Sequence, residues 1–323
     1  MSKIGILLTN TGTPSAVTTK AVRQYLKEFL SDKRVVSLPM PLWLPILYGF
    51  ILPFRPTKSA KLYKKIWQAN GSPMRVIMQN LSQALEKQLQ HILQIECHVA
   101  IGMNYGEPSI DTGFTQLYSK NVEKIITLPL FPQYSHVTTA STEDRLLASI
   151  KKYNIKVDFN FIKHYQDHPV YIDALAASVK QQWEATGQAH LLISFHGIPK
   201  KMAAKGDPYI QECEATANRL AGALKLSKNE WTLCYQSRFG YKKWLEPATH
   251  QVLKQLVQKN IRQVNIICPG FAVDCLETLE EIAIRAKHIF LAEGGESLQY
   301  IPALNDSRAQ VDLLAAIVAS HTC

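Results

Sequence analysis

The chain has 323 residues, which is long for one typical domain and suits two domains of about 150 residues each. Its hydrophobic fraction of 46% and charged fraction of 19%, without a long polar or repetitive tract, argue against disorder. The net charge of +10 comes from Lys and Arg residues spread along the chain, without zinc-finger spacing, an RNA-binding signature or a basic run, so we expect no nucleic-acid partner. A basic surface equally favours an anionic small substrate or an anionic membrane face.

Short apolar runs rich in β-branched residues alternate with longer helical patterns along the whole chain. We predict eight strands, over residues 4–9, 97–103, 124–129, 156–161, 190–195, 231–235, 263–268 and 298–301. Helical segments include residues 19–30, 76–93, 209–224, 247–259 and 274–291. Strands separated by helices of this length indicate βαβ units with parallel sheets. The strands divide into four and four, which predicts an α/β protein with an N-terminal lobe (1–165) and a C-terminal lobe (166–323). The last predicted helix, residues 306–320, could pack on either lobe.

Residues 38–54 form the one conspicuously apolar stretch, and four prolines interrupt it. Its length is at the bottom of the range that spans a bilayer, which argues against a transmembrane helix. Two interpretations remain open. The segment is either a loop and short helix folded into the core, or an exposed apolar lip that receives an apolar ligand or touches a membrane.

Six cysteines show neither a CxxC pair nor a regular framework. The chain opens on a strand-like run, residues 3–8, and lacks the basic, then apolar, then small-residue order of a signal peptide. Reduced thiols in a cytoplasmic protein are the simplest explanation.

Polar residues gather at predicted strand ends in the second half of the chain, in the runs 194–199, 206–209, 236–240 and 269–281. In an open α/β sheet, ligands bind outside the carboxyl ends of the strands. His196 ends its strand and is followed by Gly197, which permits a tight turn. A neutral imidazole there could take a proton or bind a metal, although a solvated or structural histidine is the ordinary alternative.

The predicted helix over residues 274–291 carries an acidic stripe of roughly 80°. Its members are Asp274, Glu277, Glu281, Arg285 and His288, with Leu279, Ile282, Ala286, Ile289 and Phe290 on the opposite face. From Glu281 onward, a solvated helix face explains the pattern. Asp274 and Glu277 differ because they occupy the first turn, directly after a strand end. One imidazole with one or two carboxylates can ligate a divalent metal. So few ligands bind a metal too weakly for a structural site, but they suit a metal that is passed on to another ligand.

The polar triplet Gln236-Ser237-Arg238 also follows a strand. It could orient an anionic ligand through Arg238, or it could only tie loops together. Residues 9–14 form a turn after the first strand with too little glycine for a dinucleotide fingerprint, and no Walker A motif occurs. These absences argue against dehydrogenases and NTPases.

Several motifs occur in one order along nearly the whole chain. They are Asn10-x-Gly12-Thr13-Pro14, Tyr63 with Gly71-Ser72-Pro73, Pro132-Gln133-Tyr134-Ser135, Ser194-Phe195-His196-Gly197-x-Pro199 with Gly206-Asp207-Pro208-Tyr209, Cys213 and Thr216, Gln236-Ser237-Arg238-Phe239-Gly240 with Trp244-Leu245, and Gly270-Phe271 with the run 274–282. In these motifs the chain strongly resembles the ferrochelatases, enzymes that insert ferrous iron into a porphyrin to make haem.

The resemblance implies a chelatase-type fold of two Rossmann-like lobes with the porphyrin cleft between them. It implies a lyase of haem biosynthesis whose substrates are Fe²⁺ and protoporphyrin IX. The family's catalytic and metal-binding histidine and glutamate fall on His196 and Glu277, and its acidic companions fall on Asp274 and Glu281. Its aromatic walls fall on Tyr63, Trp244 and Phe271, and Arg55 and Ser72 lie near the propionates. Residues 38–54 coincide with the family's apolar lip, which favours the exposed interpretation and a weak peripheral membrane contact.

The chain also departs from the family pattern. Asn104 stands where many relatives carry arginine, and Thr9 and Thr11 replace more apolar residues. Some members bind a [2Fe–2S] cluster through cysteines of a C-terminal extension, whereas this tail offers only Cys323. We therefore expect no cluster and no permanently bound cofactor.

Other functions remain to be weighed. The same reaction on coproporphyrin is the nearest, although the apolar lip favours the more hydrophobic protoporphyrin. A cobalt or nickel chelatase of a sirohydrochlorin-type ring fits less well, since those relatives are usually shorter and have other histidine patterns. A porphyrin or haem carrier would not need both His196 and Glu277. An α/β interaction protein would require the ordered motifs to be coincidence.

Overall fold

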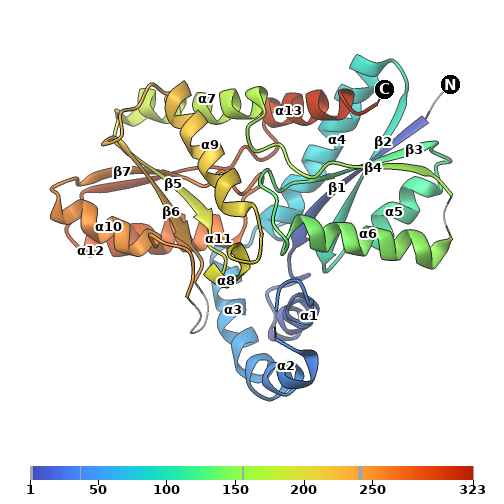
Figure 1. The fold of residues 1–323 in the computed structure, drawn as a ribbon, viewed down its shortest axis with the longest axis horizontal. Helices are drawn as coiled ribbons and strands as arrows, with labels where there is room; N and C mark the ends of the chain where they lie inside the picture. The colour runs from blue at the N-terminus through green and yellow to red at the C-terminus, as the bar shows by residue number, and fades with distance from the viewer. Residues whose placement is uncertain (1–2, 37, 155, 239–242, 323) are drawn as a thin grey trace. The chain divides into compact units, whose positions relative to one another are not determined.

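The computed structural model describes residues 3–36, 38–154, 156–238 and 243–322 (Figure 1). By its contacts the chain divides into two compact units. Unit 1 is drawn from Met1–Phe131, Ser135–Lys163 and Asp306–Cys323, and unit 2 from Pro132–Tyr134 and His164–Asn305. Each unit contains one four-stranded sheet.

The sheet of unit 1 has the strand order β2-β1-β3-β4 and is parallel throughout. Its strands are β1 (Lys3–Gly12), β2 (Glu96–Tyr105), β3 (Lys124–Pro129) and β4 (Asp158–Phe161). In the centre of the sheet, Ile6 pairs with Val99 on one side and Ile126 on the other. β1 and β3 are almost continuously buried, because helices cover both faces of a parallel sheet.

Helices lie on both faces of this sheet (Figure 1). α5 (Ile110–Tyr118) and α6 (Thr139–Tyr153) pack on one face, and α4 (Pro73–Leu93) and α13 (Arg308–Ala319) lie on the other. α4 buries Met78, Leu81, Leu85 and Leu89 at helical spacing. Two hydrogen bonds join α4 to α13 and to the residues just before it. Asn80 Nδ2 of α4 donates to Asp306 Oδ2 (2.8 Å), and Gln88 Nε2 of α4 donates to Asp312 Oδ1 of α13 (3.2 Å). The C-terminal helix thus belongs to unit 1.

The apolar segment of residues 38–54 forms a helical extension beside α1 (Thr19–Leu30). It consists of α2 (Met40–Ile46), a π-helical turn (Leu47–Ile51) and the start of α3 (Leu52–Ile66). Trp43 anchors it, since its buried ring donates from Nε1 to Leu30 O (2.6 Å). Phe50 and Phe54 are 71% and 67% exposed. These side chains are therefore exposed and not folded into the core, while a ligand or membrane contact stays a prediction. In the described ranges, no helix is both long enough and apolar enough to cross a bilayer.

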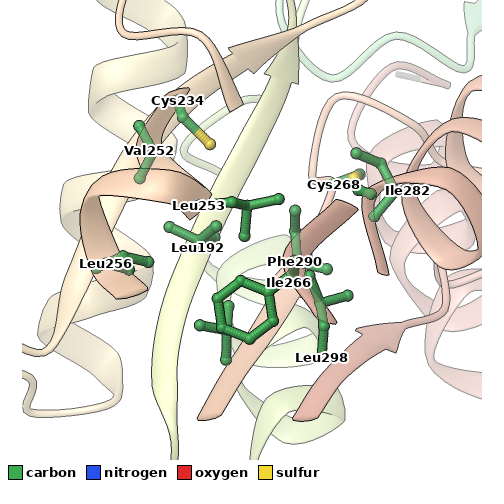
Figure 2. Packing of buried hydrophobic residues seen from close by; sticks show 12 residues of the cluster. Leu192, Cys234, Val252, Leu253, Leu256, Ile266, Cys268, Ile282, Phe290 and Leu298 are labelled. Carbon is green, nitrogen blue, oxygen red and sulfur yellow. The ribbon is translucent and has the colours of Figure 1, made fainter. Parts of the chain in front are cut away.

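The sheet of unit 2 repeats the same topology, in the order β6-β5-β7-β8. Its strands are β5 (His190–His196), β6 (Trp231–Gln236), β7 (Gln263–Ile267) and β8 (Ser297–Ile301). α7 (Pro169–Thr186) and α9 (Tyr209–Ala223) lie on one face, α10 (Thr249–Gln258) and α12 (Lys287–Ala292) on the other, and the short α8 is Lys200–Ala203. Figure 2 shows the core on the second face, where Leu192, Ile266 and Leu298 of the strands meet Leu253 of α10 and Phe290 of α12.

All eight predicted strands are present, within two or three residues of the predicted bounds, in two parallel sheets of four. The predicted α/β class is confirmed. The prediction of one regular α-helix over residues 274–291 is wrong. That segment is α11 (Leu276–Thr278), a π-helix (Leu279–Ala286) and α12.

The wider i→i+5 turn of the π-helix changes which side chains face inward. Glu280, which the predicted stripe did not include, is 1% exposed and its Oε2 accepts from Arg285 Nη2 (2.7 Å). Ile289, predicted on the apolar face, is 38% exposed. Within the predicted stripe, Arg285 and His288 are exposed as expected, whereas Asp274 is buried.

Candidate active site in unit 2

His196 is the last residue of β5 and pairs with Gln236 of β6. Gly197 N donates to Gln236 O (2.8 Å), and a Cβ on Gly197 would lie only 3.0 Å from that oxygen, so glycine permits this close turn. The Nδ1 atom of His196 lies 2.6 Å from Gly197 O. A carbonyl only accepts, so Nδ1 carries the proton and donates. In the neutral ring this leaves the Nε2 lone pair available for a proton or a metal.

Two aromatic side chains flank the imidazole. The ring centroids of Trp244 and Phe271 both lie 6.4 Å from that of His196, at tilts of 56° and 55°. Trp244 is held by a backbone bridge to Pro199, and Phe271 packs against the core of unit 2. All three rings are partly exposed, so they present an apolar wall beside a basic nitrogen.

Gln236 is a buried hub that links the strand ends. Its Oε1 accepts from Ser194 Oγ (2.8 Å) and Cys268 Sγ (3.3 Å), and its Nε2 donates to Glu277 O (2.8 Å). Both polar atoms of the amide are therefore paired, which rigidifies the link. Because β5 and β7 are the strands at which the winding direction reverses, the hub lies beside the topological switch point, the usual ligand position in such sheets.

Glu277 lies in the first turn of α11 and is partly exposed. The Cys275 thiol is hydrogen-bonded to its carboxylate, and burial together with the negative charge of Glu277 raises the pKa of Cys275 well above its ordinary value. The thiol therefore stays protonated and donates. In the part of the chain that the structure describes, no three His, Cys, Asp or Glu side chains are grouped as a metal cage.

Asp274 and Glu281 are held by hydrogen bonds. The carboxylate of Asp274, which is 5% exposed, accepts from Thr278 Oγ1 (2.8 Å), Tyr300 Oη (2.6 Å) and Asn305 Nδ2 (2.8 Å). Glu281 accepts from both the backbone N (2.8 Å) and the Oγ (2.5 Å) of Ser237. Arg238 is exposed, while Phe239 and Gly240 of the same motif lie outside the described residues.

The three remaining predicted porphyrin contacts lie in unit 1. Arg55 is half-buried on α3, and Tyr63 of the same helix is buried with its ring edge-on to Trp67 at 6.2 Å. Ser72 is the N-cap of α4, where its Oγ accepts from Arg75 N (3.3 Å). Asn104, the departure from the family pattern, is buried and accepts from Thr142 Oγ1 (2.9 Å).

Sequence reasoning missed Tyr300 and Asn305. Tyr300 is on β8 and Asn305 follows it, and Asn305 is 31 positions from Asp274 in the chain. A separation of that size carries no periodicity, so only the fold reveals the contact.

A model of the ferrochelatase family matches residues 3–322. The chain belongs to the ferrochelatase family. It is 48% identical over 320 residues to a ferrochelatase of Vibrio atlanticus, covering 99% of this chain and 98% of that one. It is 47% identical over 319 residues to ferrochelatase 1 of Shewanella oneidensis, covering 98% and 96%. The predicted family, lyase class and ferrochelatase function are confirmed.

Two solved structures support the chelatase-like fold of this ferrochelatase-family chain. SirB from Bacillus subtilis with Fe³⁺ matches with a TM-score of 0.56 and 13% identity, covering 99% of this chain and 95% of that one. CbiX, the terminal enzyme for biosynthesis of siroheme in denitrifying bacteria, matches with a TM-score of 0.54 and 12% identity, covering 99% and 100%. At these identities the likeness concerns the fold alone.

Proposed function

We propose that this chain inserts Fe²⁺ into protoporphyrin IX with His196 and Glu277 as its reacting groups. The observation that carries the proposal is the hydrogen bond from His196 Nδ1 to Gly197 O, which leaves Nε2 available on a ring that lies close to two aromatic rings. Through Gln236, the same sheet edge holds the turn that bears Glu277. A base and a carboxylate at one edge suit a reaction that exchanges protons for a metal.

Metallation requires two pyrrole N–H protons to leave while a hydrated cation loses water. The Nε2 atom of His196 either accepts pyrrole protons or presents the iron. Glu277 offers a partly exposed carboxylate for Fe²⁺ or H⁺, and Asp274 lies one turn before it, enclosed by protein hydrogen bonds. Two ligands without a preassembled cage bind a metal weakly enough for it to move on to the ring. Trp244 and Phe271 contact the macrocycle, whose bending would expose the nitrogen lone pairs.

Three residues of unit 1 are also proposed as porphyrin contacts, on the family resemblance. The Arg55 guanidinium is suited to a propionate carboxylate, and the Ser72 hydroxyl can donate its proton to one while still capping α4. Tyr63 adds an aromatic contact. The exposed apolar surface of residues 38–54 favours protoporphyrin over coproporphyrin, whose additional carboxylates would need more cations. Relative rates on the two porphyrins separate these substrates.

The same apolar segment is the proposed contact with a membrane surface. Phe50 and Phe54 are exposed, and the exposed Lys58, Lys61 and Lys64 follow on α3. Apolar side chains beside lysines fit the surface of an anionic bilayer. We place the protein in the cytoplasm, a proposal that the free thiols of the five described cysteines support. No permanent cofactor or [2Fe–2S] cluster forms part of the proposal.

Anaerobic Fe²⁺ insertion into protoporphyrin IX by the purified protein, followed optically, tests the assignment. Glu277→Gln and His196→Ala should each lower kcat by about 10²- to 10⁴-fold. Glu184→Gln, which changes an exposed carboxylate on α7, is the matched control and should keep full activity. Full activity of either site variant would remove that residue from the mechanism. Tight porphyrin binding without turnover in the unchanged protein would indicate a carrier.

A further inference from the structure

Asn305 brackets the loop that leads into the catalytic turn. Its backbone N donates to Ala272 O (3.0 Å), its Nδ2 donates to Asp274 Oδ2 (2.8 Å), and its Oδ1 accepts from Asp274 N (2.7 Å). We call these three hydrogen bonds the Asn305 bracket. Asn305 has a φ of +54°, a left-handed conformation that asparagine adopts more readily than most residues. In this conformation the backbone amide and the side-chain amide of Asn305 both contact the loop of residues 272–274.

The second carboxylate oxygen of Asp274 extends the bracket into the turn that bears Glu277. Asp274 Oδ1 accepts from Tyr300 Oη (2.6 Å) and from Thr278 Oγ1 (2.8 Å), and Thr278 Oγ1 in turn accepts from Cys275 N (3.0 Å). The Tyr300 hydroxyl is the donor of this pair, because an ionised carboxylate oxygen only accepts.

Asp274 has little capacity left for a metal or a substrate proton. A carboxylate offers about four lone-pair positions. Three side-chain donors occupy Asp274, and the residue is buried. Glu277, one turn further along, is partly exposed by contrast. The two carboxylates therefore have different surroundings, one enclosed by protein donors and the other open.

We propose that Asn305 and Tyr300 are positioning residues for Glu277, acting through Asp274 and Thr278. The inference rests on the proposed role of Glu277 and deepens it. Asp274 orients the catalytic turn rather than passing iron or protons itself. Neither Asn305 nor Tyr300 touches substrate in this arrangement, so their loss should affect the rate of metallation and not the binding of the porphyrin.

Asn305→Gly removes the side chain and keeps the left-handed backbone accessible. We expect kcat to fall by about 10- to 100-fold, the range for a displaced catalytic group, with the KM for porphyrin unchanged. Asn121→Gly is the matched control, since Asn121 has a φ of +55° in unit 1, and it should keep the original kcat. Tyr300→Phe removes one hydrogen-bond donor to Asp274 and should also lower kcat at constant KM. Circular dichroism shows whether Asn305→Gly folds. If it does not fold, the kinetics of Tyr300→Phe alone test the proposal.

A double-variant cycle separates positioning from a general loss of structure. In a Glu277→Gln background, Asn305→Gly and Tyr300→Phe should cause no further loss of residual activity, because the group that they position is already gone. Losses that multiply in this background, a change confined to KM, or unchanged kcat in both variants would overturn the proposal. Full activity of Glu277→Gln alone would instead refute the role of Glu277, so the two failures are distinguishable.

Discussion

A single backbone carbonyl determines the chemistry that His196 can offer. Gly197 O accepts from Nδ1, and the tautomer follows from that contact. The sequence pattern predicted that a strand ends at His196, just before Gly197. It could not predict the tautomer, since that depends on how the turn folds back on its own ring. Only the contact between the ring and the Gly197 carbonyl, which the structure shows, favours a reactive histidine over a solvated one.

Ser237 has a left-handed backbone conformation and two hydrogen bonds to Glu281. Its φ of +66° is unusual for serine, and its N–H and Oγ both donate to Glu281. Ser237→Ala loses the hydroxyl hydrogen bond and keeps the strain, whereas Ser237→Gly loses the bond and relieves the strain. We expect the alanine variant to lose about 1.5–3 kcal/mol of unfolding free energy and the glycine variant to lose about 1 kcal/mol less.

Urea unfolding of both variants measures this difference. A Glu281→Gln background provides the control, because the hydroxyl then has no charged partner and the alanine substitution should cost much less. Equal stability of the alanine and glycine variants would show that the left-handed backbone at Ser237 carries no strain.

The elements of this fold differ in how well the sequence predicts them. Strands that are buried on both faces are continuous apolar runs between helical patterns, so all eight could be located. The π-helix could not, because its residues have an ordinary amphipathic pattern and the wider turn arises from packing. The strand ends placed His196, Gln236 and Glu277 at one sheet edge. The partners of Asp274 come from β8 and the residue that closes the following loop, beyond the reach of any local pattern.

Asp32 joins three elements of unit 1. Its carboxylate accepts from Ser141 Oγ of α6 (2.7 Å), from Tyr105 Oη at the end of β2 (2.9 Å) and from Arg34 N after α1 (2.8 Å). Burial alone would raise the pKa of Asp32, but these hydrogen bonds and the charge of Arg145 outweigh it and hold the pKa below its ordinary value of 3.8. The charged form is therefore stabilised by folding.

A lowered carboxyl pKa contributes stability above the ordinary value, and that stability is lost as the pH falls through the folded-state value. At pH 7, Asp32→Asn should be less stable than the unchanged protein by about 1–3 kcal/mol. The difference should shrink as the pH falls below 3.8, where Asp32 itself becomes protonated. Urea unfolding between pH 7 and acidic pH measures it, with Asp173→Asn on an exposed position as the control. A difference that does not change with pH would contradict the argument.

At the scale of the whole molecule, the exposed apolar segment predicts association with anionic vesicles. Each phenylalanine moved from water to lipid contributes roughly 1.5–3 kcal/mol. Phe50→Ser combined with Phe54→Ser should therefore lower vesicle binding by about 100-fold or more. Co-sedimentation measures it, and Leu147→Ser, which changes a 45% exposed side chain on α6, is the control. If the double variant sediments with vesicles as before but has a raised KM for porphyrin, the segment contacts the porphyrin and not the lipid.

The assignment of α13 to unit 1 bears on the order in which the two units mature on the ribosome. Residues 164–305 contain all four strands of unit 2 and emerge before α13 does. Unit 1 begins at the first strand, yet α13, which packs against α4 of this unit, is made only after the chain has passed through unit 2. Folding during synthesis usually proceeds from the N-terminal domain onward. Here the unit whose translation starts first is the unit whose core is closed last.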